Sequence, residues 1–154
     1  MTSYSFTARA LLKAIAERKT QAFSGIGVVF YSDLQTIAHI EMGHPKAIRP
    51  LLPILGLNEV SSVLADAAGH NSPWHDGFHL IKSSGLALTH LSHFISPPLE
   101  FFRSVPLNKR PSGARHMTAT IVSTISGIDC VGLLTAEDEL TIFENGLSII
   151  TEKI

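Results

Sequence analysis

The sequence has 154 residues, enough for one domain with a substantial hydrophobic core. Hydrophobic residues make up 45% of it and charged residues only 16%, a composition that excludes a disordered chain. The formal net charge of −1 leaves no basic surplus, so we expect no nucleic acid as a partner. A small phosphorylated ligand needs only a few local donors and stays compatible with this charge.

The single cysteine, Cys130, excludes an intrachain disulfide and lies in an apolar run typical of a buried strand. It is therefore predicted to be a small core residue and not a nucleophile. The N-terminus has no cationic start followed by an apolar block, and no window reaches 18 apolar residues without a charge. These patterns predict no signal peptide, no membrane span and a cytoplasmic location.

The first elements alternate between helix and strand. Residues 4–19 predict an amphipathic helix whose apolar face carries Phe6, Leu11, Leu12, Ile15 and Ala16. Residues 24–31, "SGIGVVFY", predict a buried strand, and residues 34–43 are expected to pair with it as a hairpin.

The middle of the chain begins with three prolines in residues 44–56, which predict loops or short turns. Residues 58–68 predict a helix with Asn58 as its N-cap. Residues 76–82 and 85–94 then predict two strands separated by a short Ser-Ser-Gly turn.

The last third starts with a proline-rich segment, residues 96–112, predicted as a long loop. Residues 113–127 predict a helix that Ser112 caps and Gly127 ends. Strands follow over 128–135 and from residue 139 onward, with an Asn-Gly turn signal between the last two. The alternation predicts an α/β fold over residues 1–154, with a mixed central sheet flanked by helices.

The stretch "SPWHDGFHLI" places ionisable groups in an apolar run, and His75 and His79 have the spacing of a helical zinc motif. Pro73 and Gly77 argue against a helix here. In a strand, residues four apart are separated by about 13 Å, too far to bind one ion. The pattern instead predicts a turn that brings His75 and Asp76 to the mouth of a strand, where Gly77 allows close approach of a ligand or another backbone. An aspartate beside a histidine in this position can hold a divalent ion. A turn aspartate bonded to its own backbone is the alternative.

A second group, Gly113, Ala114, Arg115 and His116, stands at the start of a predicted helix. Helix N-termini offer N–H groups and partial positive charge, and arginine adds a fork that fits phosphate. Cations in the first turn oppose the helix dipole unless an anion binds there, so this group favours an anion site. His90 and His93 are predicted to be strand-face or rim residues.

These stretches together resemble one family. "SPWHDGFHLIK" resembles the "SPLHDGAVII" signature of diadenylate cyclase (DAC) domains, and "SGARHMTA", about forty residues later, resembles their "GTRHRAA" signature. The segment "GIDCVGLLTAEDELTIFENG" is similar to the stretch where the family has a strand, a Ser-Glu-Glu turn, another strand and Asn-Gly. The order and spacing match over roughly residues 4–146.

The resemblance implies a nucleotidyltransferase that condenses two ATP molecules into cyclic di-AMP and releases two pyrophosphates. It implies Mn2+ or Mg2+ as cofactor and a face-to-face homodimer, in which each 3′-hydroxyl attacks the other nucleotide's α-phosphate. Asp76 matches the residue that helps to activate the hydroxyl, and His75 and Glu137 match metal-site residues. The matching nucleotide-binding positions are Gly77, Phe78, Gly113, Ala114, Arg115 and His116.

Several positions depart from the family pattern. Phe78 replaces an alanine beside the nucleotide, Ala114 replaces a threonine, and Met117 replaces the last arginine of Arg-His-Arg. Losing one charge-assisted hydrogen bond costs about 1.5–3 kcal/mol, a loss that Lys109 and Arg110 could offset from the preceding loop. Three hypotheses follow: a divergent diadenylate cyclase, a catalytically inactive DAC-like domain that senses a nucleotide, or a metal-free structural or assembly protein on the same fold.

Overall fold

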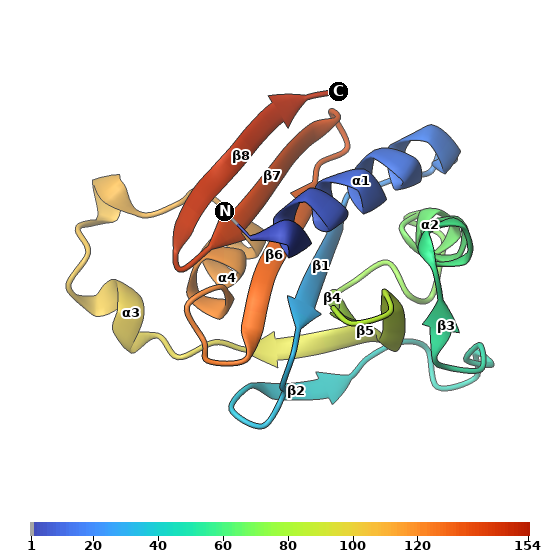
Figure 1. The fold of residues 1–154 in the computed structure, drawn as a ribbon, viewed down its shortest axis with the longest axis horizontal. Coiled ribbons are helices and arrows are strands. Elements are labelled where there is room, and N and C mark those ends of the chain that lie inside the picture. The colour runs from blue at the N-terminus through green and yellow to red at the C-terminus, as the bar shows by residue number, and fades with distance from the viewer. Residues whose placement is uncertain (1) are drawn as a thin grey trace.

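One mixed sheet of eight strands organises the chain, with helices on both of its faces (Figure 1). The computed structural model describes residues 2–154. In chain order its elements are α1 (Ser3–Arg18), β1 (Ile26–Tyr31), β2 (Ala38–Glu41), β3 (Ile54–Leu55), α2 (Leu57–Ala67), β4 (Phe78–Lys82), β5 (Ala87–Ser96), α3 (Glu100–Arg103), the 3-10 turn η1 (Leu107–Lys109), α4 (Ala114–Val122), β6 (Ile128–Leu134), β7 (Glu139–Glu144) and β8 (Leu147–Lys153).

The strand order is β2-β5-β4-β1-β6-β7-β8, and β3 adds a short pairing to β5. Strands β1 and β4 run parallel, with Val28 opposite His79, and the other strand pairings are antiparallel. A parallel pair needs a crossover, which here is the segment carrying β2, β3 and α2. The predicted α/β class with a mixed sheet is confirmed.

Strand β1 lies at the centre and is buried along its whole length. Val28 and Phe30 join a core under α1 and α2, whereas Val29 and Tyr31 join a second core under α4. Successive strand residues point to opposite faces, so a strand covered on both sides reads as a continuous apolar run. This explains why "IGVVFY" lacks polar alternation.

The predicted hairpin between residues 34–43 and β1 is wrong. Strand β2 pairs instead with β5 at the edge of the sheet, with His39 opposite Ile95. Both neighbours of β1 are the apolar strands β4 and β6, whereas the four residues of β2 are largely exposed. A polar strand is better placed at an edge, where one side meets water.

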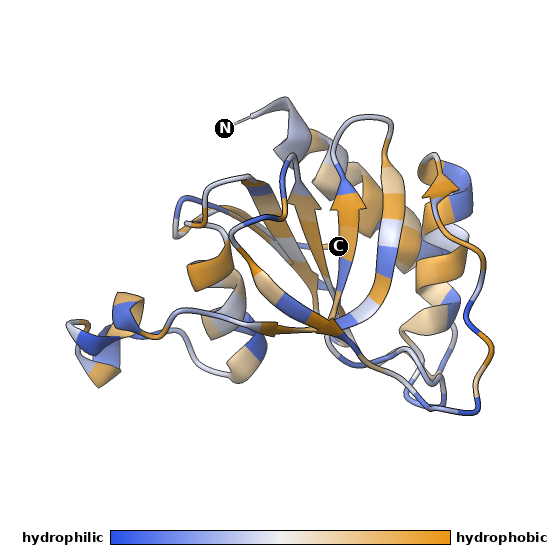
Figure 2. Ribbon diagram, turned by 90° about the horizontal axis from the view of Figure 1, so that it is seen from below, coloured by the Kyte–Doolittle hydropathy of each residue, from blue (hydrophilic) through white to orange (hydrophobic). Residues whose placement is uncertain are grey.

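Helix starts and one loop also differ from the prediction. Glycines 56 and 113, and not Asn58 and Ser112, occupy the N-cap positions of α2 and α4, and neither helix has a side-chain cap. Segment 96–112 holds the short helices α3 and η1 and extends away from the sheet (Figures 1 and 2). Among the helices of residues 2–154, none has the length and apolar character needed to span a membrane.

Candidate functional site

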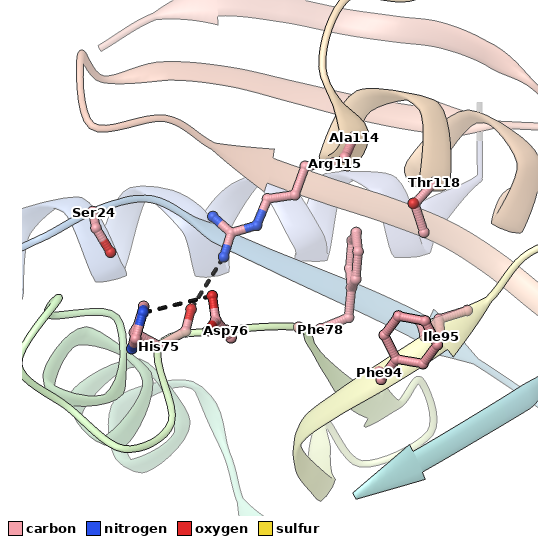
Figure 3. Close-up of a pocket in the computed structure, with 10 residues that line it drawn as sticks. Ser24, His75, Asp76, Phe78, Phe94, Ile95, Ala114, Arg115 and Thr118 are labelled. Atoms are coloured by element: carbon pink, nitrogen blue, oxygen red, sulfur yellow. Dashed lines mark hydrogen bonds and ion pairs between the residues drawn. The ribbon is translucent and has the colours of Figure 1, made fainter. Parts of the chain in front are cut away.

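A cleft of about 430 Å³ opens where the start of β4, the end of β5 and the N-terminus of α4 meet (Figure 3). Its lining combines ionisable, apolar and hydroxyl-bearing side chains: Ser24, His75, Asp76, Gly77, Phe78, Phe94, Ile95, Ala114, Arg115 and Thr118. The charged groups lie at one end and the aromatic and aliphatic groups at the other (Figure 3). Six of the nine residues that the sequence singled out therefore share one cleft.

The turn before β4 presents His75 and Asp76 side by side. The Nδ1 of His75 lies 2.9 Å from the carbonyl oxygen of Ser72, and its Nε2 lies 3.5 Å from Oδ1 of Asp76. Because a carbonyl only accepts, Nδ1 carries the proton and the lone pair of the neutral ring is on Nε2. The Asp76 side chain is 66% exposed and points into the cleft (Figure 3).

Gly77 fixes this turn against strand β5. Its φ of 76° lies in the left-handed region, and a Cβ there would stand 2.5 Å from the carbonyl oxygen of His93. The hydroxyl of Ser92 also donates to the carbonyl oxygen of Asp76 at 2.8 Å. The glycine thus serves close approach of another backbone, one of the two uses that the sequence indicated.

Arg115 reaches from the first turn of α4 to the His75–Asp76 turn. Its Nη2 donates to the carbonyl oxygen of His75 at 3.1 Å (Figure 3). Burial lowers the pKa of Arg115, and the nearby Asp76 carboxylate partly opposes this effect. A desolvated guanidinium at a helix N-terminus without acidic residues in its first turn is a strong anion-binding group.

Glu137, His116 and Gly113 do not line this cleft. Glu137 and His116 line an adjacent cavity of about 310 Å³, which shares Ser24 and Arg115 with the first. The His116 ring also meets Phe143 edge to face, with 6.0 Å between ring centres. Gly113 is the N-cap of α4. Arg115 and Ser24 therefore border both cavities, and Arg115 is the charged side chain of the two.

The bulky side chain of Phe78 borders the cleft but is packed into the protein core. The side chain is 4% exposed and belongs to the core under α4. A Cβ at Gly27 of β1 would lie 2.6 Å from Cε2 of Phe78, so the ring packs where β1 has no side chain. The bulky Phe78 side chain is thus accommodated by a glycine on the neighbouring strand.

Four cleft residues were missed by the sequence reasoning: Ser24, Phe94, Ile95 and Thr118. Thr118 stands four residues after Ala114, one helical turn later, so the helix period could have indicated a hydroxyl on the same face. Ser24 directly precedes a glycine at the start of β1. Phe94 and Ile95 carried no signal, because their position depends on the pairing of β5.

The two loop cations do not reach the cleft. Lys109 lines a different cavity beside Phe101 and Phe102, and Nε of Arg110 donates to the carbonyl oxygen of Val105 at 2.7 Å. Neither side chain lies where it could replace a cation at the start of α4 in this conformation, so the structure does not support the expected compensation by Lys109 and Arg110.

The fold has known counterparts, although no protein-family model and no curated protein sequence matches the chain. The crystal structure of a hypothetical membrane spanning protein from Bacillus cereus matches with a TM-score of 0.60 and 16% identity, covering 100% of this chain and 65% of that one. A double mutant of DacA from Staphylococcus aureus matches with a TM-score of 0.54 and 14% identity, covering 98% and 85%. This chain thus spans about two thirds of the Bacillus cereus protein. The diadenylate cyclase-like fold implied by the motifs is confirmed; at these identities the likeness concerns the fold alone.

Proposed function

We propose that this protein is a divergent diadenylate cyclase, which binds ATP in the cleft and condenses two ATP molecules into cyclic di-AMP. One observation carries the proposal: the guanidinium of Arg115 and the carboxylate of Asp76 meet in the same cleft, and Arg115 donates to the carbonyl of the residue before Asp76. In nucleotidyl transfer, a cation that holds the phosphates beside an acid that can take up a hydroxyl proton serves both positioning and charge stabilisation.

The phosphate end of the nucleotide belongs at the start of α4. The backbone N–H groups there and the fork of Arg115 bind phosphate oxygens, and the hydroxyl of Thr118 lies in the same cleft. The apolar end, with Phe78, Phe94 and Ile95, suits the flat faces of a nucleobase.

In this proposal Asp76 accepts the proton of an attacking 3′-hydroxyl, which its exposed carboxylate in the cleft supports. In the proposed reaction each 3′-oxygen forms a bond to the α-phosphorus of the other ATP, and the bond from that phosphorus to the bridging oxygen of pyrophosphate breaks. Two pyrophosphates leave and each hydroxyl proton is transferred to a base. Because Asp76 is largely exposed at an open cleft, it can face a second copy of the chain, which supports a face-to-face homodimer.

The residues fit a hard divalent ion only in part. His75 directs its Nε2 lone pair toward Asp76, and Glu137 borders the adjacent cavity beyond Arg115. Within residues 2–154, no three His, Cys, Asp or Glu side chains are arranged to hold a metal. Mg2+ commonly binds through one or two protein ligands plus substrate phosphates, so His75 and Asp76 would hold Mn2+ or Mg2+ together with ATP. When bound, the ion neutralises phosphate charge and polarises the hydroxyl.

Incubation of the purified protein with ATP and Mn2+, followed by chromatographic analysis for cyclic di-AMP, tests the proposal. We expect product from the wild-type chain and none above background from Asp76→Asn. Absence of product from a wild-type sample that is dimeric and binds ATP would overturn the cyclase proposal.

A second candidate, a nucleotide-binding domain without turnover, is favoured by Ala114 and Met117, which remove a hydroxyl and a cation that the family places near the phosphates. It predicts that ATP or cyclic di-AMP raises the melting temperature while ATP stays intact. The same samples decide between the two candidates, because ligand-induced stabilisation and product formation are read separately.

A further inference from the structure

Three histidines form a cluster at the sheet edge where β2 pairs with β5. The ring centres of His39, His90 and His93 are 5.2 Å, 5.0 Å and 4.9 Å apart in their three pairings. His93 is buried, whereas His39 and His90 are half-buried and reachable from solvent. None of the three lines the cleft with Asp76.

A β-bulge brings the two histidines of β5 together. His90 and His93 are three residues apart and would point to opposite faces of a regular strand. Phe78 of β4 pairs with His93 of β5, and Leu80 of β4 pairs with His90 of β5. The two β4 residues are two positions apart and the two β5 residues are three apart, so β5 carries one extra residue here. Ser92, within this stretch, has a positive φ of 57°. Bulges commonly re-aim side chains at functional sites, and this one places both rings beside His39.

The hydrogen bonds of His90 leave one nitrogen available as a ligand. Oγ1 of Thr89 donates to the carbonyl oxygen of Leu80 at 3.2 Å and lies 2.8 Å from Nδ1 of His90. When the Thr89 hydroxyl, which also contacts the Tyr31 hydroxyl at 2.6 Å, gives its proton to Leu80, Nδ1 of His90 donates to it and the lone pair of His90 is on Nε2. Metal-binding histidines typically make such a hydrogen bond through their other nitrogen.

The spacing of the rings matches a three-histidine metal site. With Zn–N bonds of about 2.0–2.1 Å at tetrahedral angles, imidazole ring centres lie roughly 5 Å apart. In the ring orientations of the structure, Nδ1 of His39 and Nδ1 of His93 lie 2.9 Å apart and share a hydrogen bond. Among the described residues, no three His, Cys, Asp or Glu side chains are already arranged around one metal position. The second side-chain torsion of histidine is broad and nearly two-fold, so the rings can turn without moving the strands.

The local charges permit a cation. Burial lowers the pKa of His93, and its ring lies beside the rings of His39 and His90. Arg49, whose charge also acts on His93, is paired with Glu41 at 3.0 Å and donates to two backbone carbonyls, those of Met42 and Leu91.

We propose that His39, His90 and His93 form a binding site for a divalent transition-metal ion, with Zn2+ as the preferred ion and water completing its coordination. Imidazole ligands suit Zn2+, Ni2+ and Cu2+ far better than Mg2+ or Mn2+. The site is independent of the proposed nucleotide function, since neither its ligands nor its metal takes part in the Asp76 cleft.

Titration of the metal-free, nucleotide-free protein with Zn2+ in a calorimeter, and with Co2+ in a spectrophotometer, tests the site. We expect one Zn2+ per chain, a higher melting temperature, and the visible absorption band of tetrahedrally bound Co2+. His39→Gln and His90→Gln, at half-buried positions, are each expected to weaken Zn2+ binding at least tenfold. His70→Gln, at an exposed histidine, is the matched control and should leave Zn2+ binding unchanged.

A melting curve without metal establishes that each variant folds. Folded His39→Gln and His90→Gln proteins that bind Zn2+ as tightly as the His70→Gln control would overturn the proposal. So would a wild-type chain without stoichiometric Zn2+ binding at micromolar concentrations.

Discussion

The ring of Phe78 on β4 packs directly against the bare backbone of Gly27 on β1. A Cβ at Gly27 would stand 2.6 Å from Cε2 and 2.7 Å from Cδ2 of this ring. The two strands are parallel neighbours, so the pair lies at the centre of the sheet, next to the cleft. The absent side chain on β1 therefore creates the room for the aromatic side chain that borders the candidate site.

Gly27→Ala is expected to destabilise the protein, because its methyl group overlaps the Phe78 ring. Overpacking of this kind typically costs about 1–3 kcal/mol. The free energy of unfolding in urea gives the effect, and Phe78→Leu in the Gly27→Ala background should recover part of it. Strictly additive effects of the two substitutions would show that the residues do not compete for this space.

Asp76→Asn is expected to remove turnover while ATP binding persists. The substitution keeps the size of the side chain but removes the proton acceptor, and loss of a general base typically lowers the rate by about 10²–10⁴-fold. Product formation and ATP affinity are measured on the same preparation. An Asp76→Asn protein with the wild-type rate would remove Asp76 from the proposed mechanism.

Glu144 of β7 ties the start of α1 to the sheet and should make stability depend on pH. Its carboxylate accepts hydrogen bonds from the backbone N–H and hydroxyl of Thr2 and from the hydroxyl of Ser5. Burial raises its pKa, but the hydrogen bonds from Ser5 and Thr2 outweigh this effect, so the net pKa lies below the ordinary 4.5. A carboxyl with a lowered pKa stabilises the fold above its unfolded pKa, and this contribution is lost as the pH falls through the folded value.

We therefore expect the free energy of unfolding to fall below about pH 4.5 in the wild-type chain, and less steeply in Glu144→Gln. Urea titrations between pH 3 and pH 7 measure this difference. Glu139→Gln, at an exposed glutamate at the start of the same strand, is the control and should follow the wild-type curve. Parallel curves for wild type and Glu144→Gln would contradict the role of this carboxylate.

Cys130 should not react in the native protein. It is fully buried in β6, and burial raises the pKa of its thiol to about 12, so almost no thiolate forms at pH 8. Ellman's reagent should modify no thiol in the native state and one per chain in 6 M guanidinium. Rapid modification of the folded protein would contradict the buried position.

Local patterns were sufficient for most elements of this fold. The apolar run of β1, the glycine-separated β4 and β5, and the period of α1 each depend on neighbouring residues, and each was predicted. The place of β2 was not, because its partner β5 lies about fifty residues later in the chain and only the sheet order determines the pairing. Phe6 also follows the helical period, yet its side chain is 58% exposed.

In the candidate site, too, local motifs predicted some features, whereas features that depend on strand pairing could not be predicted. The motifs identified Asp76 and Arg115, and the structure places both in one cleft. The packing of the Phe78 ring in the space beside Gly27 could not be predicted from the sequence, because it depends on the register of two strands separated by about fifty residues. The bulge that gathers His90 and His93 was hidden for the same reason, since it is defined only against β4.

The affinity of Arg115→Met for ATP with Mn2+, measured by calorimetry against wild type and Arg103→Met, shows whether Arg115 binds the phosphates of the nucleotide. Arg103 is 75% exposed and pairs with Glu100 within its own helix, so its loss serves as the control. Removing a charge-assisted contact of about 1.5–3 kcal/mol predicts roughly 10- to 150-fold weaker binding by Arg115→Met and wild-type affinity for Arg103→Met. Equal ATP affinities for the two variants would contradict the account, because the anion would then bind elsewhere.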